Sequence, residues 1–175
     1  VWDKVDGVDI LVYLPEGYKD EDERYPVMYM FDGQNIFSTN FAPIKWGIDD
    51  ICDELAKEGK LQKMIVVGIY HGGEKRFNEY VPYYYDTGKV YAEWLVKKVV
   101  MHIDENYRTK ADRTNRGIMG SSLGGLMALY MVNNYSDYFS FAGGISTCDP
   151  WNNDKIGELS KKDVKVWIDT GSGEY

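Results

Sequence analysis

The chain has 175 residues, of which 44% are hydrophobic and 27% charged, a composition typical of one globular domain. Its net charge of −8 and isoelectric point of about 4.8, with basic residues scattered along the chain, argue against a nucleic-acid or anionic-membrane partner. No run approaches the roughly 18 apolar residues that a membrane-spanning helix needs, so no membrane partner is expected.

The first predicted elements are two strands and a helix. Residues 8–14 (VDILVYL) form a β-type run, which a Pro-Glu-Gly turn closes. Residues 26–31 (PVMYMF) are almost continuously apolar, as expected of a strand buried on both faces, and a polar loop follows at residues 32–35. Residues 47–59 have apolar side chains at helical spacing, with two aspartates in the first turn and Gly59 as the expected stop.

The second half continues the alternation of strands and helices. A second buried strand is predicted at residues 64–70, and a long polar and aromatic connection follows at 71–88. The later predicted elements are a long helix at 90–107, a strand at 116–120, a helix from there to about 134, a strand at 139–145, a loop around Pro150-Trp151, a weak helix at 155–159 and a last strand at 164–169. This order predicts a mostly parallel sheet with helices on both faces and an active site at the carboxyl ends of the strands.

The functional prediction depends on a G-x-S-x-G motif centred on Ser122, with Gly120 and Gly124 at its ends. It lies between an apolar run and a helix-period run, which is the strand–turn–helix setting of a nucleophile elbow. Such a turn holds the serine in a strained conformation that exposes its hydroxyl, and only glycine fits two residues to either side. A frame centred on Ser121 lacks those glycines. The alternative is a glycine-rich turn with a spectator serine.

Together these stretches resemble the putative-esterase family of α/β-hydrolases, which includes enterochelin, feruloyl and acetyl-xylan esterases, S-formylglutathione hydrolase and mycolyltransferases. The resemblance rests on residues 25–33 (YPVMYMFDG), 66–70 (VVGIY), 103–109 (IDENYRT) and the elbow, in the family's order. It implies an α/β-hydrolase fold and an acyl-enzyme intermediate on Ser122. No metal, nucleotide or flavin signature is present, so no cofactor is expected, and Cys52 and Cys148 make neither a metal motif nor a disulfide framework.

The resemblance also implies roles around the serine. The oxyanion hole would consist of the backbone N–H groups of Leu123 and Gln34, with Gly33 allowing close approach. The alternative for the second donor is an ordinary polar turn. The family carries its triad acid where Glu174 stands, and glutamate is allowed in this fold. Asp169 is the second candidate, although it is expected on the last strand rather than past it.

A triad histidine is missing from its expected place. In this fold the order is Ser, acid, His, and only Tyr175 follows Glu174. Both histidines precede Ser122. His102 falls inside the predicted long helix and is expected to be packed or half-exposed, whereas His71 follows a strand and is expected to line the substrate site rather than act as the base. Further lining candidates after the same strand are Arg76, Glu79 and Tyr80.

The simplest explanation is that residues 1–175 are a single α/β-hydrolase domain that lacks the last strand and histidine loop and is clipped at Val1. The predicted function is a serine carboxylic-ester hydrolase acting on carbohydrate-linked or aryl esters, which the 15 tyrosines and 5 tryptophans, concentrated in connecting segments, would suit. Two alternatives stay open: an acyltransferase of the same fold, and a non-catalytic α/β-hydrolase module that binds a glycan or protein. Compartment and oligomeric state are not predicted.

Overall fold

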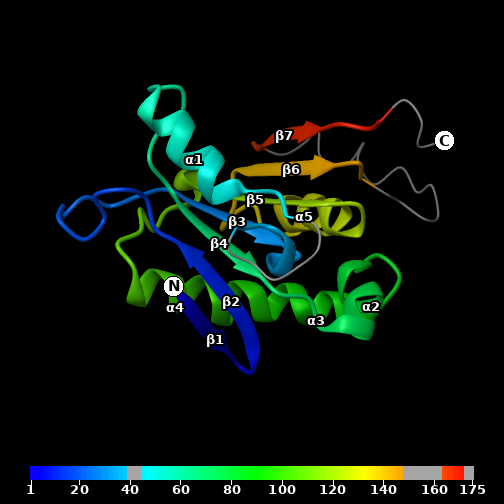
Figure 1. Ribbon diagram of the computed structural model, residues 1–175. Coiled ribbons are helices and arrows are strands. Elements are labelled where there is room, and N and C mark those ends of the chain that lie inside the picture. Colours follow the sequence, from blue (N-terminus) through cyan, green and yellow to red (C-terminus); the bar gives the residue numbers. More distant parts are fainter. Residues whose placement is uncertain (39–44, 148–162, 172–175) are drawn as a thin grey trace.

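The computed structural model describes residues 1–38, 45–147 and 163–171, in which seven strands form one sheet of order β1-β2-β4-β3-β5-β6-β7 (Figure 1). The strands from β4 to β7 in this order run parallel, and β1 and β2 are antiparallel additions at one edge. The mostly parallel sheet predicted from the sequence is therefore confirmed. The strand bounds are β1 (Trp2–Val5), β2 (Val8–Tyr13), β3 (Val27–Phe31), β4 (Ile65–Ile69), β5 (Arg116–Ser121), β6 (Phe141–Ile145) and β7 (Lys165–Ile168).

The hairpin of β1 and β2 turns at Asp6-Gly7, where both residues have positive φ, 49° and 87°. Val5 pairs with Val8 across this two-residue turn. An Asp-Gly pair is the preferred sequence for a tight turn of this kind, because glycine and aspartate tolerate positive φ. From the sequence, the first strand is predicted at residue 8 and no bounds are predicted for β1, although the Asp-Gly turn signal was present.

Helical segments connect the strands, and the predicted bounds were wrong for two regions. The segment predicted as a connection at 71–88 contains helical structure, and the helix predicted at 90–107 begins earlier, at Asp86. Gly88 was read as part of the connection, but it lies inside the helix, where a Cβ would come within 2.7 Å of Pro82. The segments are η1 (Gly33–Asn35), α1 (Ile48–Lys57), η2 (Gly73–Lys75), α2 (Arg76–Tyr80), α3 (Asp86–Trp94), the π-helical η3 (Leu95–Val100), α4 (Met101–Asn106), η4 (Arg113–Asn115) and α5 (Leu123–Asn134).

Helices cover both faces of the sheet, as predicted. Helix α1 packs on one face, where Cys52 joins a cluster with Leu11, Met30 and Val66. The rod of α3, η3 and α4 and the helix α5 pack on the other face, against Ile10, Tyr29, Val67 and Ile118 (Figure 1). Helix α5 is buried from residue 123 to residue 132, which explains why its sequence is apolar all round. The loop predicted around Pro150-Trp151 and the helix predicted at 155–159 lie outside the described residues.

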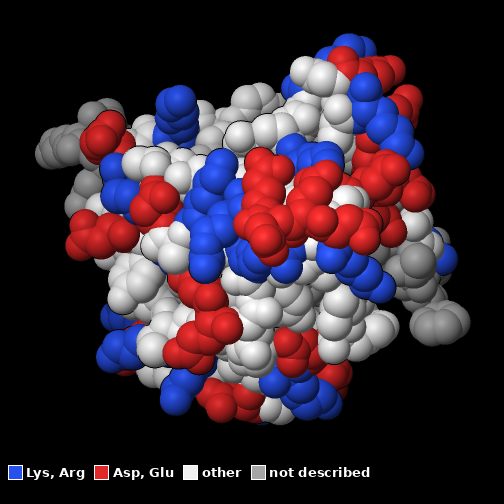
Figure 2. All heavy atoms as spheres, turned by 90° about the vertical axis from the view of Figure 1, so that its left-hand side faces the viewer, with Lys and Arg blue, Asp and Glu red and all other residues white. Residues whose placement is uncertain are grey.

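The far edge of the sheet is more open than its centre. Among the described strands, β7 pairs only with β6, and its Val166, Trp167 and Ile168 are 37%, 50% and 39% exposed. An exposed apolar edge strand is uncommon in stable monomers. On the face that Figure 2 views, acidic and basic side chains are interspersed. Within residues 1–38, 45–147 and 163–171, no helix has the length and apolar character needed to cross a bilayer.

Asp3 joins the hairpin to α4. Its carboxylate lies 2.6 Å from His102 Nε2, accepts from the Tyr107 hydroxyl at 3.3 Å, and accepts from the Lys4 N–H at 2.8 Å. Burial alone would raise the pKa of Asp3, but the hydrogen bonds from His102, Lys4 and Tyr107 outweigh it and the pKa is lowered. Ionised Asp3 therefore stabilises the fold above its unfolded pKa of about 3.9. This contribution is lost as the pH falls through the lower folded value.

We expect Asp3→Asn to flatten the acid limb of the stability profile. Between pH 5 and pH 3 the wild type should lose about 0.5–1 kcal/mol more free energy of unfolding than the variant, a small value because the pair is partly solvated. Urea denaturation at the two pH values measures both losses. Equal losses in the two proteins would show that Asp3 contributes nothing to the pH dependence.

Candidate active site

Ser122 occupies a sharp turn between β5 and α5 with φ 54° and ψ −122°, a conformation that is sparsely populated for residues other than glycine. Its N–H donates to the Ile145 carbonyl at 2.9 Å, which ties the turn to β6. Its carbonyl accepts from the N–H groups of Gly125 and Leu126 at 3.1 and 3.2 Å, which begins the helix. The Ser122 side chain is half-buried, and its hydroxyl bonds to none of the described residues.

The glycines of the motif are required by the packing of β5 against α5. A Cβ on Gly120 would lie 2.7 Å from the carbonyl carbon and 2.8 Å from the oxygen of Gly124. A Cβ on Gly124 would lie 3.2 Å from Phe31 Cβ and 3.3 Å from Asp32 Oδ2. The first contact would be with backbone and could not relax without separating strand from helix. The turn thus has the geometry expected of a nucleophile elbow.

The loop after β3 carries the backbone N–H of Gln34, which follows β3 at the same edge of the sheet where the Leu123 N–H follows β5. Asp32 adopts a left-handed conformation, φ 59° and ψ 46°, and starts the short helix η1. A Cβ on Gly33 would lie 2.5 Å from the carbonyl carbon of Gly68, so the close approach that Gly33 allows is to the backbone of β4. In the described part of the chain, neither the Gln34 N–H nor the Leu123 N–H has a backbone acceptor.

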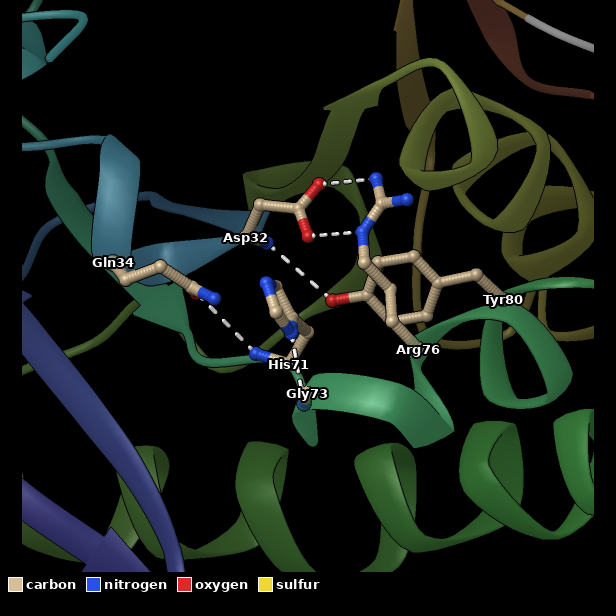
Figure 3. Close-up of polar contacts among 6 residues, drawn as sticks. All are labelled: Asp32, Gln34, His71, Gly73, Arg76 and Tyr80. Carbon is tan, nitrogen blue, oxygen red and sulfur yellow. Dashed lines mark hydrogen bonds and ion pairs between the residues drawn. The ribbon is translucent and has the colours of Figure 1, made fainter. Parts of the chain in front are cut away.

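An ion pair between the buried Asp32 and the half-buried Arg76 holds this loop (Figure 3). The Asp32 carboxylate accepts from Arg76 Nε and Nη2, both at 2.7 Å, in the two-pronged geometry that arginine favours. The side chains of Asp32 and Arg76 are 10% and 25% exposed. Tyr80 lies beside the pair, where its hydroxyl accepts from the Asp32 N–H at 3.4 Å and its ring centre lies 5.0 Å from the guanidinium carbon. The pair therefore fixes the loop to α2.

Tyr80 was considered as a lining residue, and the structure corrects this expectation because its side chain is fully buried. Burial raises the pKa of Tyr80 well above its ordinary value, so the phenol stays protonated at neutral pH. Arg76 and Glu79 are half-buried and reach the surface.

His71 lies beside the loop and is held by two contacts. The backbone N–H of His71 donates to Gln34 Oε1 at 3.4 Å, and the ring Nδ1 accepts from the backbone N–H of Gly73 at 2.9 Å (Figure 3). A neutral ring that accepts at Nδ1 carries its proton on Nε2, so it has no second free lone pair with which to act as a base. His102, half-exposed as predicted, lies on α4 and contacts Asp3 instead.

Of the two candidate acids, Asp169 lies in the described part of the chain. Glu174 is outside the described residues. Strand β7 ends at Ile168, so Asp169 follows the strand, whereas the prediction placed it on the strand. Asp169 Oδ1 accepts from the Ser146 N–H at 3.0 Å, and Ser146 directly follows the carbonyl that receives the Ser122 N–H. Within the described ranges, no group of three or more His, Cys, Asp or Glu side chains is arranged to hold a metal ion.

The sequence of the chain matches the family model described as "Putative esterase" over residues 6–175. The chain belongs to this family. One relative of the chain is an endo-1,4-beta-xylanase/feruloyl esterase of Xylanibacter ruminicola, which is 31% identical over 140 residues, covering 77% of the chain and 19% of the relative. Another is the Esterase Rv1288 of Mycobacterium tuberculosis, 26% identical over 80% of the chain and 28% of the relative.

Solved structures show the same fold. A mutant feruloyl esterase module from Clostridium thermocellum, complexed with sinapinate, is 24% identical with a TM-score of 0.71, covering 98% of this chain and 66% of that one. The enterobactin esterase of Shigella flexneri, in the presence of enterobactin, is 14% identical with a TM-score of 0.73, covering 95% and 43%. These neighbours establish the α/β-hydrolase fold. The chain spans only part of each of these relatives' length.

We expect the two elbow glycines to differ in their tolerance of a methyl group. Gly120→Ala should lower the free energy of unfolding by about 3 kcal/mol, the upper part of the range for overpacking, because its new Cβ meets backbone. Gly124→Ala should cost about 1 kcal/mol, since its contacts relax by a few tenths of an ångström. Thermal and urea unfolding of both variants, with Ser121→Ala as a control of unchanged stability, measure this order. The reverse order would contradict the packing argument.

We expect Arg76→Ala to destabilise the protein by about 3 kcal/mol, because it leaves the Asp32 carboxylate buried without its counter-ion. Arg76→Lys keeps the charge without the two-pronged geometry and should recover only part of the loss. Denaturation curves measure both, with the exposed neighbour Lys75→Ala as the control. Equal stability of the Ala and Lys variants would show that the charge of Arg76 does not matter.

Proposed function

We propose that this chain is a serine carboxylic-ester hydrolase that forms an acyl-enzyme on Ser122. The observation that carries the proposal is a juxtaposition: a strained, half-buried serine stands at the start of α5, and two N–H groups, of Leu123 and Gln34, have no backbone acceptor among the described residues. Membership in an esterase family supports the same conclusion.

In the proposed reaction Ser122 Oγ attacks the carbonyl carbon of the ester. The carbonyl oxygen becomes an oxyanion, which accepts from the Leu123 N–H and the Gln34 N–H. Each such donor contributes about 3–4 kcal/mol to transition-state stabilisation in serine hydrolases. The carbon–oxygen bond to the alcohol then breaks, and the alcohol leaves with a proton. Water attacks the acyl-enzyme through a second oxyanion and releases the carboxylic acid.

The proton of Ser122 needs an acceptor, because a neutral hydroxyl is a weak nucleophile. The 175 residues contain two histidines, and neither has contacts that suit a general base for Ser122. His71 accepts from Gly73 through Nδ1, and His102 lies against Asp3. Glu174 remains the proposed triad acid and Asp169 the second candidate. The same histidine placement favours the second candidate function, a non-catalytic module, and labelling of Ser122 separates the two.

We further propose that the substrates are carbohydrate-linked or aryl esters. The support lies in the matched relatives, which include a xylanase/feruloyl esterase and a feruloyl esterase module complexed with sinapinate. The 15 tyrosines and 5 tryptophans of the chain also support this proposed substrate class.

We expect a fluorophosphonate to label the 175-residue chain slowly at Ser122, and added imidazole to accelerate labelling by supplying a base. General bases contribute about 10²–10⁴-fold in enzymes, so an acceleration of about tenfold is a modest expectation for a diffusing one. Intact-mass spectrometry measures the rate with and without imidazole. Ser122→Ala should not be labelled, and the matched control Ser121→Ala should react like the wild type.

Three results decide between the functions. Ser122-dependent labelling that imidazole accelerates supports the esterase. Rapid labelling without imidazole also supports it, but means that a base acts within the chain or between copies of it. Failure to label Ser122 under either condition supports the non-catalytic module.

A further inference from the structure

A groove of about 1030 Å³ lies on the catalytic edge of the sheet, between the hairpin tip and α3. Residues 6–9 form one wall, residues 86–94 form the other, and the end of β4 with the following turn forms the base. Its volume is at the upper end of the range for small-molecule sites. The sequence predicted substrate-lining roles for His71 and Glu79, but neither the sequence nor the proposed chemistry at Ser122 assigns a role to the rest of this groove.

The groove reaches the proposed oxyanion loop. His71 and Gly72 line it, and the His71 N–H donates to Gln34 Oε1. Strand β4, which leads to His71, is the immediate neighbour of β3, which leads to Gln34. His71 therefore connects the lining of the groove to the loop that would hold the carbonyl oxygen of an ester. The groove is suited to the part of a substrate that extends beyond the ester bond.

Both aromatic rings and hydrogen-bonding groups line the groove. Tyr70 and Trp94 are half-buried, and Tyr91 packs against Trp94 with the ring centres 5.4 Å apart. The Trp94 Nε1–H donates to Asp6 Oδ2 at 3.1 Å, which fixes the indole against the hairpin tip. The lining also includes amide, hydroxyl and carboxylate groups, from Asn78, Thr87 and Glu79. Sugar rings present apolar C–H faces and hydroxyl edges, and this lining offers partners for both.

The charges of the groove favour a neutral ligand. Four carboxylates line it, but Asp9 pairs with Lys4 at 3.0 Å and Asp86 pairs with Lys89 at 2.9 Å. Lys75 lines the groove close to Glu79, since both approach Gly72 within 3.4 Å of its Cβ position. The four carboxylates are thus offset by Lys75 in the lining and by Lys4 and Lys89 beside it, which leaves little net charge to attract a cation. The carboxylates still accept hydrogen bonds from hydroxyl groups.

We infer that this groove binds a neutral oligosaccharide, the glycan part of a carbohydrate-linked ester whose ester bond lies at Ser122. The position of the ester rests on the proposed function, whereas sugar binding itself does not. The aromatic lining, the balanced charge and the contact between His71 and the oxyanion loop together carry the inference.

Calorimetric titration of Ser122→Ala with xylotetraose, cellotetraose and maltotetraose tests it, with choline as the cationic probe. At least one tetrasaccharide should bind and should bind more tightly than choline. Trp94→Ala in the same background should weaken that binding by about tenfold or more, as expected for loss of an aromatic anchor. Val90→Arg is the second variant: Val90 lines the groove at 66% exposure, so its replacement obstructs the groove without disturbing the core. Trp167→Ala, at an exposed tryptophan on β7, is the matched control and should leave binding unchanged.

Absence of binding by all three sugars overturns the inference, as does binding that neither Trp94→Ala nor Val90→Arg weakens. Tighter binding of choline than of any tetrasaccharide also overturns it and assigns the groove to cations. Because these titrations use a chain without the Ser122 hydroxyl and do not measure turnover, their failure leaves the labelling result at Ser122 unaffected. A chain that binds sugar but resists labelling would retain this inference and lose the proposed hydrolysis.

Discussion

The close contact between the end of β5 and the first turn of α5 is the constraint on which the rest of the site depends. Gly120 lies against the backbone of Gly124, which leaves no room for a Cβ on Gly120. Ser122, between the two glycines, is held at positive φ. This conformation is unfavourable by roughly 1–3 kcal/mol. It persists because α5 is buried along most of its length and because Ser122 is bonded to β6. Core packing therefore holds the serine in place.

The second constraint is electrostatic. The Asp32 carboxylate lies 3.3 Å from the Cβ position of Gly124, in the first turn of α5, and Asp32 begins the loop that leads to Gln34. A lone negative charge there would oppose an oxyanion held, as proposed, by the N–H groups of Leu123 and Gln34. Arg76 pairs with that charge through two hydrogen bonds, so the start of α5 keeps its attraction for the oxyanion of the proposed reaction. The ion pair thus shapes the loop and neutralises its charge at the same time.

The sequence was informative where one local rule decided the structure. Nearly continuous apolar runs predicted the central strands, because strands buried on both faces admit few other residues, and the glycine spacing around Ser122 predicted the elbow. The short helix α2 was missed because five residues carry no helical periodicity, and the start of α3 was missed because Gly88, which packs against Pro82, reads as a loop residue. The pairing of Asp32 with Arg76 joins residues 44 positions apart, a contact that no local pattern in one sequence reveals.

The parts of the site differ in how they are held. Leu123 is buried at the start of α5, and Ser122 and Gln34 are half-buried beyond the ends of β5 and β3. Asp169, the acid candidate that the structure describes, follows β7, an exposed edge strand. In serine hydrolases an oxyanion hole and binding contacts keep about 10³–10⁴-fold catalysis when the triad is disabled. A site whose proposed oxyanion donors lie beside the packed contact of β5 and α5, and whose proposed acid follows an edge strand, can therefore keep its shape when the proton relay is incomplete. On this argument the stability of the elbow and the reactivity of its serine are separable properties of this fold.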